Sequence, residues 1–284
     1  MSTTPANDKI VDYPPLPEAL PAPVVDNHCH MDIERHGHEM LDPAEALQKA
    51  ASVGVTRIVQ IGCDLPSARW AVEAAQRFDT VIAGVALHPN DAPLHADLDA
   101  AIAEIEALAT AHDKVRVIGE TGLDFFRTGD EGRAAQEESF RRHIDLAIRL
   151  DKTLQIHDRD AHEAVLQVMD QVGYPDRWVM HCFSGDAAFA RKCLDRGAYL
   201  SFSGTVTFGN AGDIREALAI TPSDRILVET DAPFLTPTPH RGKTNSAYLI
   251  PVTMRAMAAV RAADLEELCV QVNVNTEAAF GGTW

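Results

Sequence analysis

The segment VVDNHCHMD places two histidines, His28 and His30, two residues apart at the end of an apolar run. In a β-strand, residues two apart point to the same side, so both imidazoles can face one ion while Cys29 faces the other way. A set of histidines and carboxylates with open coordination positions suits zinc, manganese or magnesium. Two residues alone do not decide between a metal site and a strand that happens to carry histidines, so the other ligands must come from elsewhere in the chain.

Other apolar runs also end in residues that bind metals. The run TVIAGVALH ends in His88, KVRVIGE in Glu120, TLQIH in His157 and RWVMH in His181, while Asp231 follows RILVET. Five of the 12 histidines of the chain stand at such ends, whereas chance placement would scatter them over helices and loops. The repeated placement indicates that these side chains meet in space and bind metal together.

The elements that must position these residues alternate along the chain. Apolar strand-like runs begin at Val24, Thr56, Thr80, Lys114, Thr153, Arg177, Ala198 and Arg225. Helical patterns cover Pro43–Val53, Ser67–Phe78, Leu98–Ala111, Arg133–Leu150, His162–Val172, Ala187–Arg196, Ala211–Ile220, Val252–Ala263 and Leu265–Ala279. Eight strand–helix units predict an α/β fold of one domain, a (β/α)₈ TIM barrel over residues 24–284. A doubly wound open sheet is the rival, but the G-x-G-x-x-G turn usual in that fold is missing from the sequence.

The barrel gives the strand ends a common location. Active sites of TIM barrels lie where the strands end, at the C-terminal face. All the candidate ligands are therefore expected at one face, which we call the mouth of the barrel. Two divalent ions that share a bridging carboxylate would suit hydrolysis of a phosphodiester there.

Composition limits the partners and the location of the protein. The net charge is 25 − 42 = −17, which argues against broad binding to a nucleic-acid backbone but allows a local site that holds a single phosphate. No run reaches the roughly 18 continuous apolar residues of a membrane span. The first 23 residues contain six prolines and no export signal, so we interpret residues 1–23 as a Pro-rich N-terminal extension. Five cysteines without a C-x-x-C pair favour reduced thiols and a cytoplasmic protein.

Five motifs together resemble the TatD family of metal-dependent hydrolases: DNHCHMD, GETGLDFFR, QIHDRDA, VMHCFSGD and ETDAPFLTPTPHRGKTN. The resemblance implies a TIM-barrel phosphodiesterase of the amidohydrolase superfamily, a deoxyribonuclease that often acts from the 3′ end. It implies that His28 and His30 bind one metal, that Glu120 is shared between two, and that His157 and His181 bind the second. Asp231 would be a ligand that also takes a proton from the attacking water.

Other residues near the expected mouth have less definite roles. By the same resemblance, HRGK provides Arg241 for a phosphate, and Lys243 is either a second contact or part of an ordinary basic loop. His88 remains open as a ligand, a support for a ligand or a phosphate contact. His36 and His38 lie in a polar loop and are expected in solvent, and Glu229 is a weaker ligand candidate than Asp231. The family usually continues with Glu-Pro after the asparagine, whereas here Ser246 and Ala247 follow Asn245.

Three functions compete at this point. The first is a metal-dependent deoxyribonuclease, an exonuclease on single-stranded or frayed DNA ends. The second uses the same metal site on an ester or amide, such as a D-aminoacyl-tRNA. The third is a metal-bearing scaffold without catalysis, which a missing ligand would favour, and no expected ligand is missing. Expected partners are DNA ends or another phosphodiester, with no membrane and no obligate protein partner.

Overall fold

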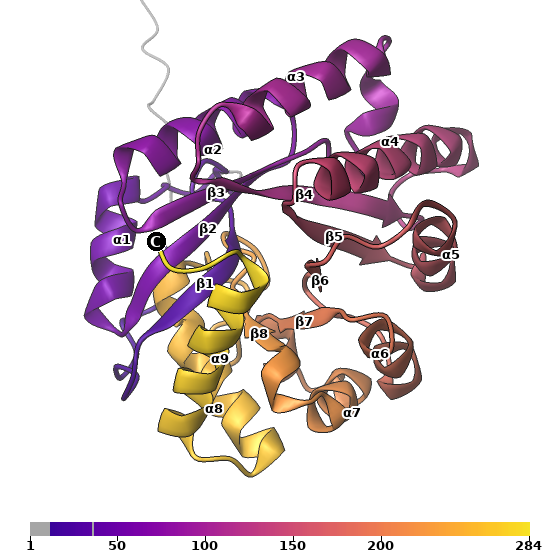
Figure 1. Ribbon diagram of the computed structural model, residues 1–284. Coiled ribbons are helices and arrows are strands. Elements are labelled where there is room, and N and C mark those ends of the chain that lie inside the picture. The colour runs from indigo at the N-terminus through magenta and orange to yellow at the C-terminus, as the bar shows by residue number, and fades with distance from the viewer. Residues whose placement is uncertain (1–11, 36) are drawn as a thin grey trace, which may run out of the picture.

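Each apolar run forms a strand in the computed structural model, which describes residues 12–35 and 37–284. Eight parallel strands lie in chain order in one sheet that curls into a barrel, with the helices outside it (Figure 1). The strands are β1 (Val24–Cys29), β2 (Val55–Gly62), β3 (Val81–Val85), β4 (Val115–Asp124), β5 (Thr153–Arg159), β6 (Trp178–Met180), β7 (Tyr199–Phe202) and β8 (Ile226–Val228). The TIM barrel predicted from the sequence is therefore confirmed.

The outer ring consists of α-helices that follow the strands. They are α1 (Pro43–Ser52), α2 (Leu65–Arg77), α3 (Leu98–Thr110), α4 (Asp130–Arg149), α5 (His162–Val172), α6 (Ala187–Leu194), α7 (Gly212–Ile220), α8 (Ile250–Arg261) and α9 (Leu265–Ala279). Several begin directly after an aspartate whose carboxylate accepts a backbone N–H of the first turn, as Asp186 does from Phe189. Helix α4 begins three residues before the expected Arg133, because Asp130 and Glu131 suit the positive end of a helix dipole.

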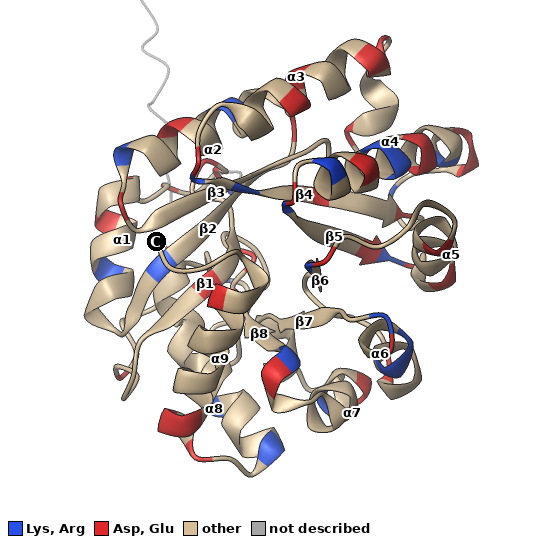
Figure 2. Ribbon diagram, in the orientation of Figure 1, with Lys and Arg blue, Asp and Glu red and all other residues tan. Residues whose placement is uncertain are grey.

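Short 3₁₀ helices supplement this plan, and the sequence patterns did not indicate them. They are η1 (Ala92–Leu94), η2 (Gly204–Thr207), η3 (Ser223–Arg225) and η4 (Ala247–Leu249). Many acidic positions lie on outer helices such as α3, α4 and α5 (Figure 2), while Asp26, Glu120, Asp124 and Asp158 lie on strands. The charge of −17 is therefore distributed over the outer surface, and its local sign at the mouth depends on the loops.

The barrel closes between β1 and β8 at the mouth. These two strands stand at opposite ends of the strand order. The N–H of Asp231 donates to the carbonyl oxygen of His28 over 2.9 Å, and the N–H of His30 donates to that of Ala232 over 2.8 Å. Below them, the side-chain amide of Asn27 donates to the carbonyl oxygen of Val228 over 2.8 Å. Closure of the barrel thus fixes Asp231 beside the two histidines of β1.

Two hydrophobic layers support the strands. One fills the barrel interior with residues such as Val25, Ile61 and Leu227, and Phe280 after α9 packs into the same cluster. The other lies between strands and helices, where Val24 and Cys29 are buried. His28 and His30 point to the mouth and Cys29 packs outside the barrel, as strand alternation predicts. All five cysteines of the described chain are free thiols.

The described part of the N-terminal extension lies against the barrel. Its Leu20 is buried in the outer core, and the Leu20 N–H donates to the carbonyl oxygen of Val53 over 3.0 Å. The hydroxyl of Tyr248 donates to the carbonyl oxygen of Pro14 over 2.5 Å. Residues 1–11 lie outside the described residues. In the part of the chain that the structure describes, no helix has the length and apolar character needed to cross a membrane.

A buried histidine outside the barrel joins α4 to β3. His143 is fully buried, and its Nε2 accepts the backbone N–H of Leu87 over 3.2 Å while Nδ1 lies 2.7 Å from the carbonyl oxygen of Ser139. Only the neutral imidazole with its proton on Nδ1 fits both partners, because protonation of Nε2 would set two N–H groups against each other. Burial accordingly lowers the pKa of His143 to about 4, from an ordinary value near 6.5.

We predict that His143 makes the fold sensitive to acid. Between pH 6.5 and 4, His143 binds a proton in the unfolded chain but not in the native chain. The contribution of neutral His143 to stability is therefore complete above about pH 6.5 and is lost as the pH falls toward 4. The loss amounts to about 3 kcal/mol of unfolding free energy. Glutamine at this position can make both hydrogen bonds without titrating. Urea unfolding at pH 7 and pH 4.5 should show a smaller loss for His143→Gln than for the wild type, and equal losses would contradict this role.

Candidate active site

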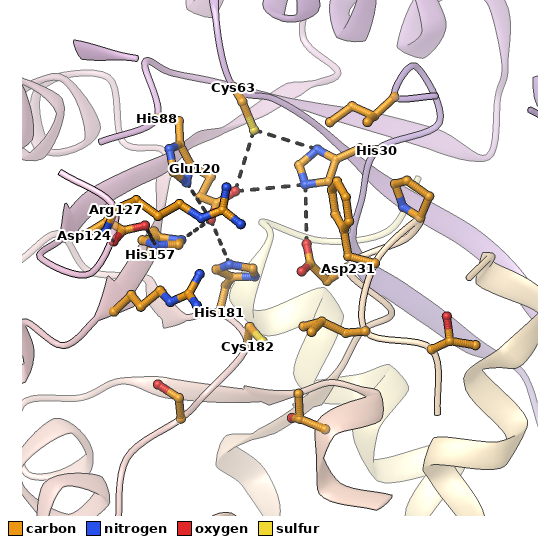
Figure 3. Close-up of a pocket in the computed structure, with 18 of the residues that line it drawn as sticks. His30, Cys63, His88, Glu120, Asp124, Arg127, His157, His181, Cys182 and Asp231 are labelled. Atoms are coloured by element: carbon orange, nitrogen blue, oxygen red, sulfur yellow. Dashed lines mark hydrogen bonds and ion pairs between the residues drawn. The ribbon is translucent and has the colours of Figure 1, made fainter. Parts of the chain in front are cut away.

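The candidate ligands converge on a cavity of about 700 Å³ at the mouth of the barrel (Figure 3). The lining residues include His30, Glu120, His157, His181 and Asp231. Glu120 and His157 lie on β4 and β5, and the others lie in the segments that follow β1, β6 and β8. His28 is completely buried directly beneath them, 3.2 Å from His30 between the two Nε2 atoms. The structure thus brings together all six residues that the sequence indicated as metal ligands.

Glu120 stands at the centre of the cluster. Its Oε1 lies 2.6 Å from His157 Nδ1 and 2.9 Å from His181 Nε2. Its Oε2 lies 3.4 Å from His28 Nε2 and 4.0 Å from His30 Nε2. Burial opposes ionisation of this carboxyl, but the imidazoles of His181, His88 and His157 hold its pKa well below its ordinary value. A single carboxylate therefore faces two pairs of imidazoles, one from each of its oxygens.

Asp231 completes the second side of the cluster. Its Oδ1 lies 3.4 Å from His30 Nε2 and 3.7 Å from His28 Nε2. Burial opposes its ionisation too, but His30, His181 and His28 lower its pKa, so the carboxylate is the stable form at neutral pH. Its backbone follows Thr230, whose N–H and hydroxyl both donate to the buried carboxyl of Asp26. The Asp231 carboxylate is 17% exposed, so it is open to the cavity while its backbone is fixed.

Three of the four imidazoles are hydrogen-bonded from behind by an oxygen. The outer Nδ1 lies 3.0 Å from Gln155 Oε1 in His28, 2.9 Å from the carbonyl oxygen of Ile61 in His30, and 2.9 Å from Glu229 Oε1 in His181. In His157 the outer nitrogen is Nε2, which faces Asp124 Oδ2 at 3.4 Å but forms no hydrogen bond with any described residue.

An oxygen that accepts the outer N–H leaves the inner nitrogen of a neutral imidazole without a proton and pointed into the cluster. That is the state and direction a metal ligand needs.

The donor set fits divalent cations. Imidazole nitrogens and carboxylate oxygens form overlapping groups within 4.8 Å: His28, Glu120 and His181 in one, His28, His30 and Asp231 in a second, and His88, Glu120 and His157 in a third. Neighbouring donors are 3.2 to 3.7 Å apart on the side of His28, His30 and Asp231. Two ligands each roughly 2.1 Å from one tetrahedral ion would be about 3.4 Å apart. The residues are therefore suited to bind metal, with Glu120 and His28 each belonging to more than one group.

Two thiols also line the cavity. Cys63 Sγ lies 3.6 Å from Glu120 Oε2, and Cys182 Sγ lies 3.3 Å from the hydroxyl of Ser203. Burial raises the pKa of Cys63 to about 11 and that of Cys182 to about 12. Burial therefore favours the neutral thiol over the nucleophilic thiolate at both positions when no metal is bound.

The residues with less definite roles have different locations and contacts in the structure. His88 lines the cavity with Nε2 3.6 Å from Glu120 Oε1, and burial lowers its pKa to about 4, so it is neutral. Arg241 lines the cavity and stacks on the ring of Phe208, with 3.8 Å from Cζ to the ring centroid. Lys243 also lines it but pairs with Asp12 at 3.4 Å. His38 Nδ1 lies 3.4 Å from the Thr244 hydroxyl, and His36 lies outside the described residues.

Sequence reasoning missed the groups that orient the ligands. Gln155 and Asp26 each stand two residues before a predicted ligand on the same strand, so a polar residue inside an apolar run was the available signal. Asp124 ends β4, four residues after Glu120. Glu229, the weaker ligand candidate, faces His181 from behind instead of joining the cluster. The sequence carried no signal for its pairing with His181, because the two residues are far apart in the chain.

The departure at Ser246 and Ala247 does not touch the cavity. Both residues are buried, and Ala247 begins η4. The side-chain amide of the preceding Asn245 donates to the carbonyl oxygens of Thr230 over 3.0 Å and Phe234 over 2.6 Å. Among the described residues that line the cavity, neither Ser246 nor Ala247 is present. Asn245 thus fixes the loop after β8 without the Glu-Pro pair.

Comparison with known proteins agrees with this site. The family model "TatD related DNase" matches residues 25–281. The "Uncharacterized metal-dependent hydrolase TatD" of Mycobacterium tuberculosis is 45% identical over 266 residues, which are 92% of this chain and 99% of that protein. The "Uncharacterized metal-dependent hydrolase YabD" of Bacillus subtilis is 36% identical over 90% of this chain and 98% of that one.

Among solved structures, that of YJJV, a TatD homologue from Escherichia coli K12, superposes with a TM-score of 0.84 at 25% identity. The superposition covers 92% of this chain and 98% of that one.

We predict that divalent cations stabilise the protein through Glu120. At about 100 times its Kd, a bound ion contributes about 2.7 kcal/mol, which raises the Tm of a protein of this size by roughly 5–10 °C. Thermal unfolding with Mn²⁺ or Zn²⁺, against EDTA, measures this. Glu120→Gln keeps the shape but removes the central charge, so most of the shift should disappear. Glu106→Gln, on the outer helix α3 beside Arg149, is the matched control and should keep it. A wild-type Tm that neither Mn²⁺ nor Zn²⁺ changes would contradict the assignment of this cluster as a metal site.

Proposed function

This chain belongs to the TatD related DNase family of metal-dependent hydrolases, and we propose that it hydrolyses phosphodiester bonds of DNA, as an exonuclease on the 3′ end of a single strand. The observation that carries the proposal is the buried Glu120 carboxylate, which stands between two groups of imidazoles at the barrel mouth. Such a centre suits a substrate whose own charge is negative and grows in the transition state.

Different residues would bind the metal ions and accept the proton. His28, His30 and Asp231 would hold one divalent cation, His157 and His181 a second, and Glu120 both. When bound, the metal supplies Lewis acidity to the phosphate and lowers the pKa of water. Asp231 is ionised and open to the cavity, which supports a role for its Oδ1 as acceptor of the proton of the attacking water. The water oxygen bonds to phosphorus, the P–O bond to the leaving sugar oxygen breaks, and the proton held by Asp231 can be returned to that oxygen.

Two further side chains suit the phosphate. The guanidinium of Arg241 is held against Phe208 at the cavity wall and presents a planar pair of donors. His88 is neutral and close to Glu120, so one ring N–H can bind a phosphate oxygen without a competing charge. Its Nδ1 accepts the N–H of Asn90 over 3.0 Å, which leaves the proton on Nε2, facing the cluster.

The end of a single strand is the form of DNA that suits this location. The cluster lies in a cavity lined by residues of the loops after the strands, and such a site suits a strand end better than a continuous duplex. The charge of −17 also disfavours extended contact with a duplex backbone. The metal centre alone would serve an ester or amide equally, so a D-aminoacyl-tRNA deacylase is the alternative. The complete ligand set argues against a non-catalytic scaffold.

We predict that Asp231→Asn lowers the rate of DNA cleavage by roughly 10²- to 10⁴-fold while the protein remains folded, because asparagine cannot accept the proton. The assay uses single-stranded DNA labelled at the 5′ or the 3′ end, with Mg²⁺, Mn²⁺ or EDTA. A ladder that shortens from the 3′ end in metal, and only there, is the expected wild-type result.

The control for Asp231→Asn is Asp79→Asn, an exposed carboxylate paired with Lys114, which should cleave like the wild type. Full activity of Asp231→Asn would rule out the proton-acceptor role. A folded, metal-loaded wild type that leaves DNA intact but deacylates a D-aminoacyl-tRNA would replace the proposed function by its alternative.

A further inference from the structure

The turn after β4 presents an aromatic ring and a cation at the rim of the cavity. Asp124 Oδ1 accepts the backbone N–H of Phe126 over 3.0 Å and that of Arg127 over 2.8 Å. The N–H of Phe125 donates to the carbonyl oxygen of Arg159 over 2.9 Å, which brings the end of β5 beside the turn. The geometry of these bonds places Phe126 and Arg127 outside the strand, next to Arg159.

These three side chains form a surface that we call the β4–β5 wall: Phe126, Arg127 and Arg159. The guanidinium of Arg159 stacks over the Phe126 ring, with 4.0 Å from Cζ to the ring centroid. Arg127 and Arg159 line the cavity, and Phe126, which is 62% exposed and is not itself a lining residue, adjoins it through its contact with Arg159. Arg127 lines the same cavity as His157, and both are labelled in Figure 3. The wall therefore offers a free aromatic surface and two cations to a molecule in the cavity.

In the described part of the chain, Arg127 and Arg159 lack the ion pairs with carboxylates that arginines on the outer surface form. Arg142 pairs with Asp99 and Glu138, and Arg149 pairs with Glu106 and Asp145. Within residues 12–35 and 37–284, no carboxylate forms an ion pair with Arg127 or Arg159. In a chain of charge −17, two unpaired guanidinium groups beside one cavity are available for an anion from outside.

A similar arrangement stands on the opposite side. Arg241 stacks on Phe208, and Phe234, 44% exposed, lines the cavity beside them. These residues follow β7 and β8, and in a barrel of eight strands in chain order, β8 lies across from β4. The cluster around Glu120 thus lies between two walls, each with an arginine stacked on a phenylalanine.

We propose that the β4–β5 wall is a nucleotide-binding site, and that the substrate is a single strand that extends beyond the scissile phosphate onto Phe126, Arg127 and Arg159. The proposal rests on the proposed function and specifies its substrate. An exposed aromatic ring stacks bases of any sequence, and a planar guanidinium binds a phosphate through two donors. The scissile phosphate lies at the cluster, Arg241 contacts it from the β7–β8 side, and the neighbouring nucleotide lies on the β4–β5 wall. Oligonucleotides are therefore better substrates than isolated phosphodiesters.

Binding tests the wall separately from cleavage. The probe is a 5′-fluorescein thymidine pentanucleotide with a free 3′ end, titrated with Mn²⁺-loaded Asp231→Asn protein so that the strand stays intact. Added to that background, Phe126→Leu and Arg159→Met should each raise the Kd about tenfold, within the range measured for loss of base stacking. Because the two side chains touch, the double variant should lose less than the product of the single losses.

The matched control is Arg77→Met. Arg77 stacks over Phe78, with 4.9 Å from Cζ to the ring centroid, at the end of α2 away from the cavity. This substitution removes the same charge and the same kind of stack, so a Kd within about twofold of the background protein is expected. An equal loss in Arg77→Met would show that general charge, not the wall, binds the strand, and unchanged Kd values for Phe126→Leu and Arg159→Met would overturn the proposal.

Cleavage then separates the two proposals. With Asp231 intact, the loss of kcat/KM caused by Arg159→Met should be at least about fivefold larger on the pentanucleotide than on bis(p-nitrophenyl) phosphate, which has no neighbouring nucleotide. Equal losses on both substrates would overturn the wall while leaving a phosphodiesterase. A wild type that binds the pentanucleotide through the wall but hydrolyses neither substrate would overturn the proposed function and leave the binding site.

Discussion

Burial of the Glu120 carboxylate is the constraint on which the rest of the site depends. A carboxylate that is 4% exposed within strand β4 is costly unless positive charge or hydrogen-bond donors surround it. Here the surrounding groups are imidazoles from β1, β5 and the segments after β3 and β6, so one residue requires contributions from half of the barrel. Imidazolium protons meet this need without a metal, and divalent cations meet it with metal. The cluster that stabilises a buried charge is also the cluster that can do hydrolytic chemistry.

A second set of oxygens makes this arrangement specific. Gln155, Glu229, Asp124 and the carbonyl of Ile61 each face the outer nitrogen of one imidazole, so the inner nitrogens are directed at Glu120 and Asp231. Rings held in this way lose little freedom on binding an ion or a substrate. The rigid strands carry this part of the site, whereas the arginine–phenylalanine walls stand on the loops. The chemistry is thus fixed by the barrel, and the choice of substrate is left to segments that can vary without disturbing it.

The fold and the candidate ligands were largely predictable, because the strands of a TIM barrel are apolar runs that end in polar residues at the mouth. The strand ends identified His28, His30, Glu120, His157, His181 and Asp231, and the family motifs gave them roles that remain to be tested. The supporting oxygens were not predictable, because the contact of Glu229 with His181, 48 residues away, depends on how two strands align. The contact between Arg159 and Phe126 was not predictable for a similar reason. The two residues meet only because the backbone after β4 stays paired with the end of β5 at the rim of the cavity. Ser246 and Ala247, where the family usually has Glu-Pro, are buried away from the cavity.

The central claim is that inner nitrogens and carboxylates at the mouth hold divalent cations in position to act on a phosphodiester. Anomalous diffraction from a crystal of the Mn²⁺-loaded protein tests it most directly. The account predicts anomalous peaks within bonding distance of His28, His30 and Asp231 on one side of Glu120 and of His157 and His181 on the other. Peaks confined to the acidic outer helices, with the cluster empty at saturating Mn²⁺ and neutral pH, would contradict it.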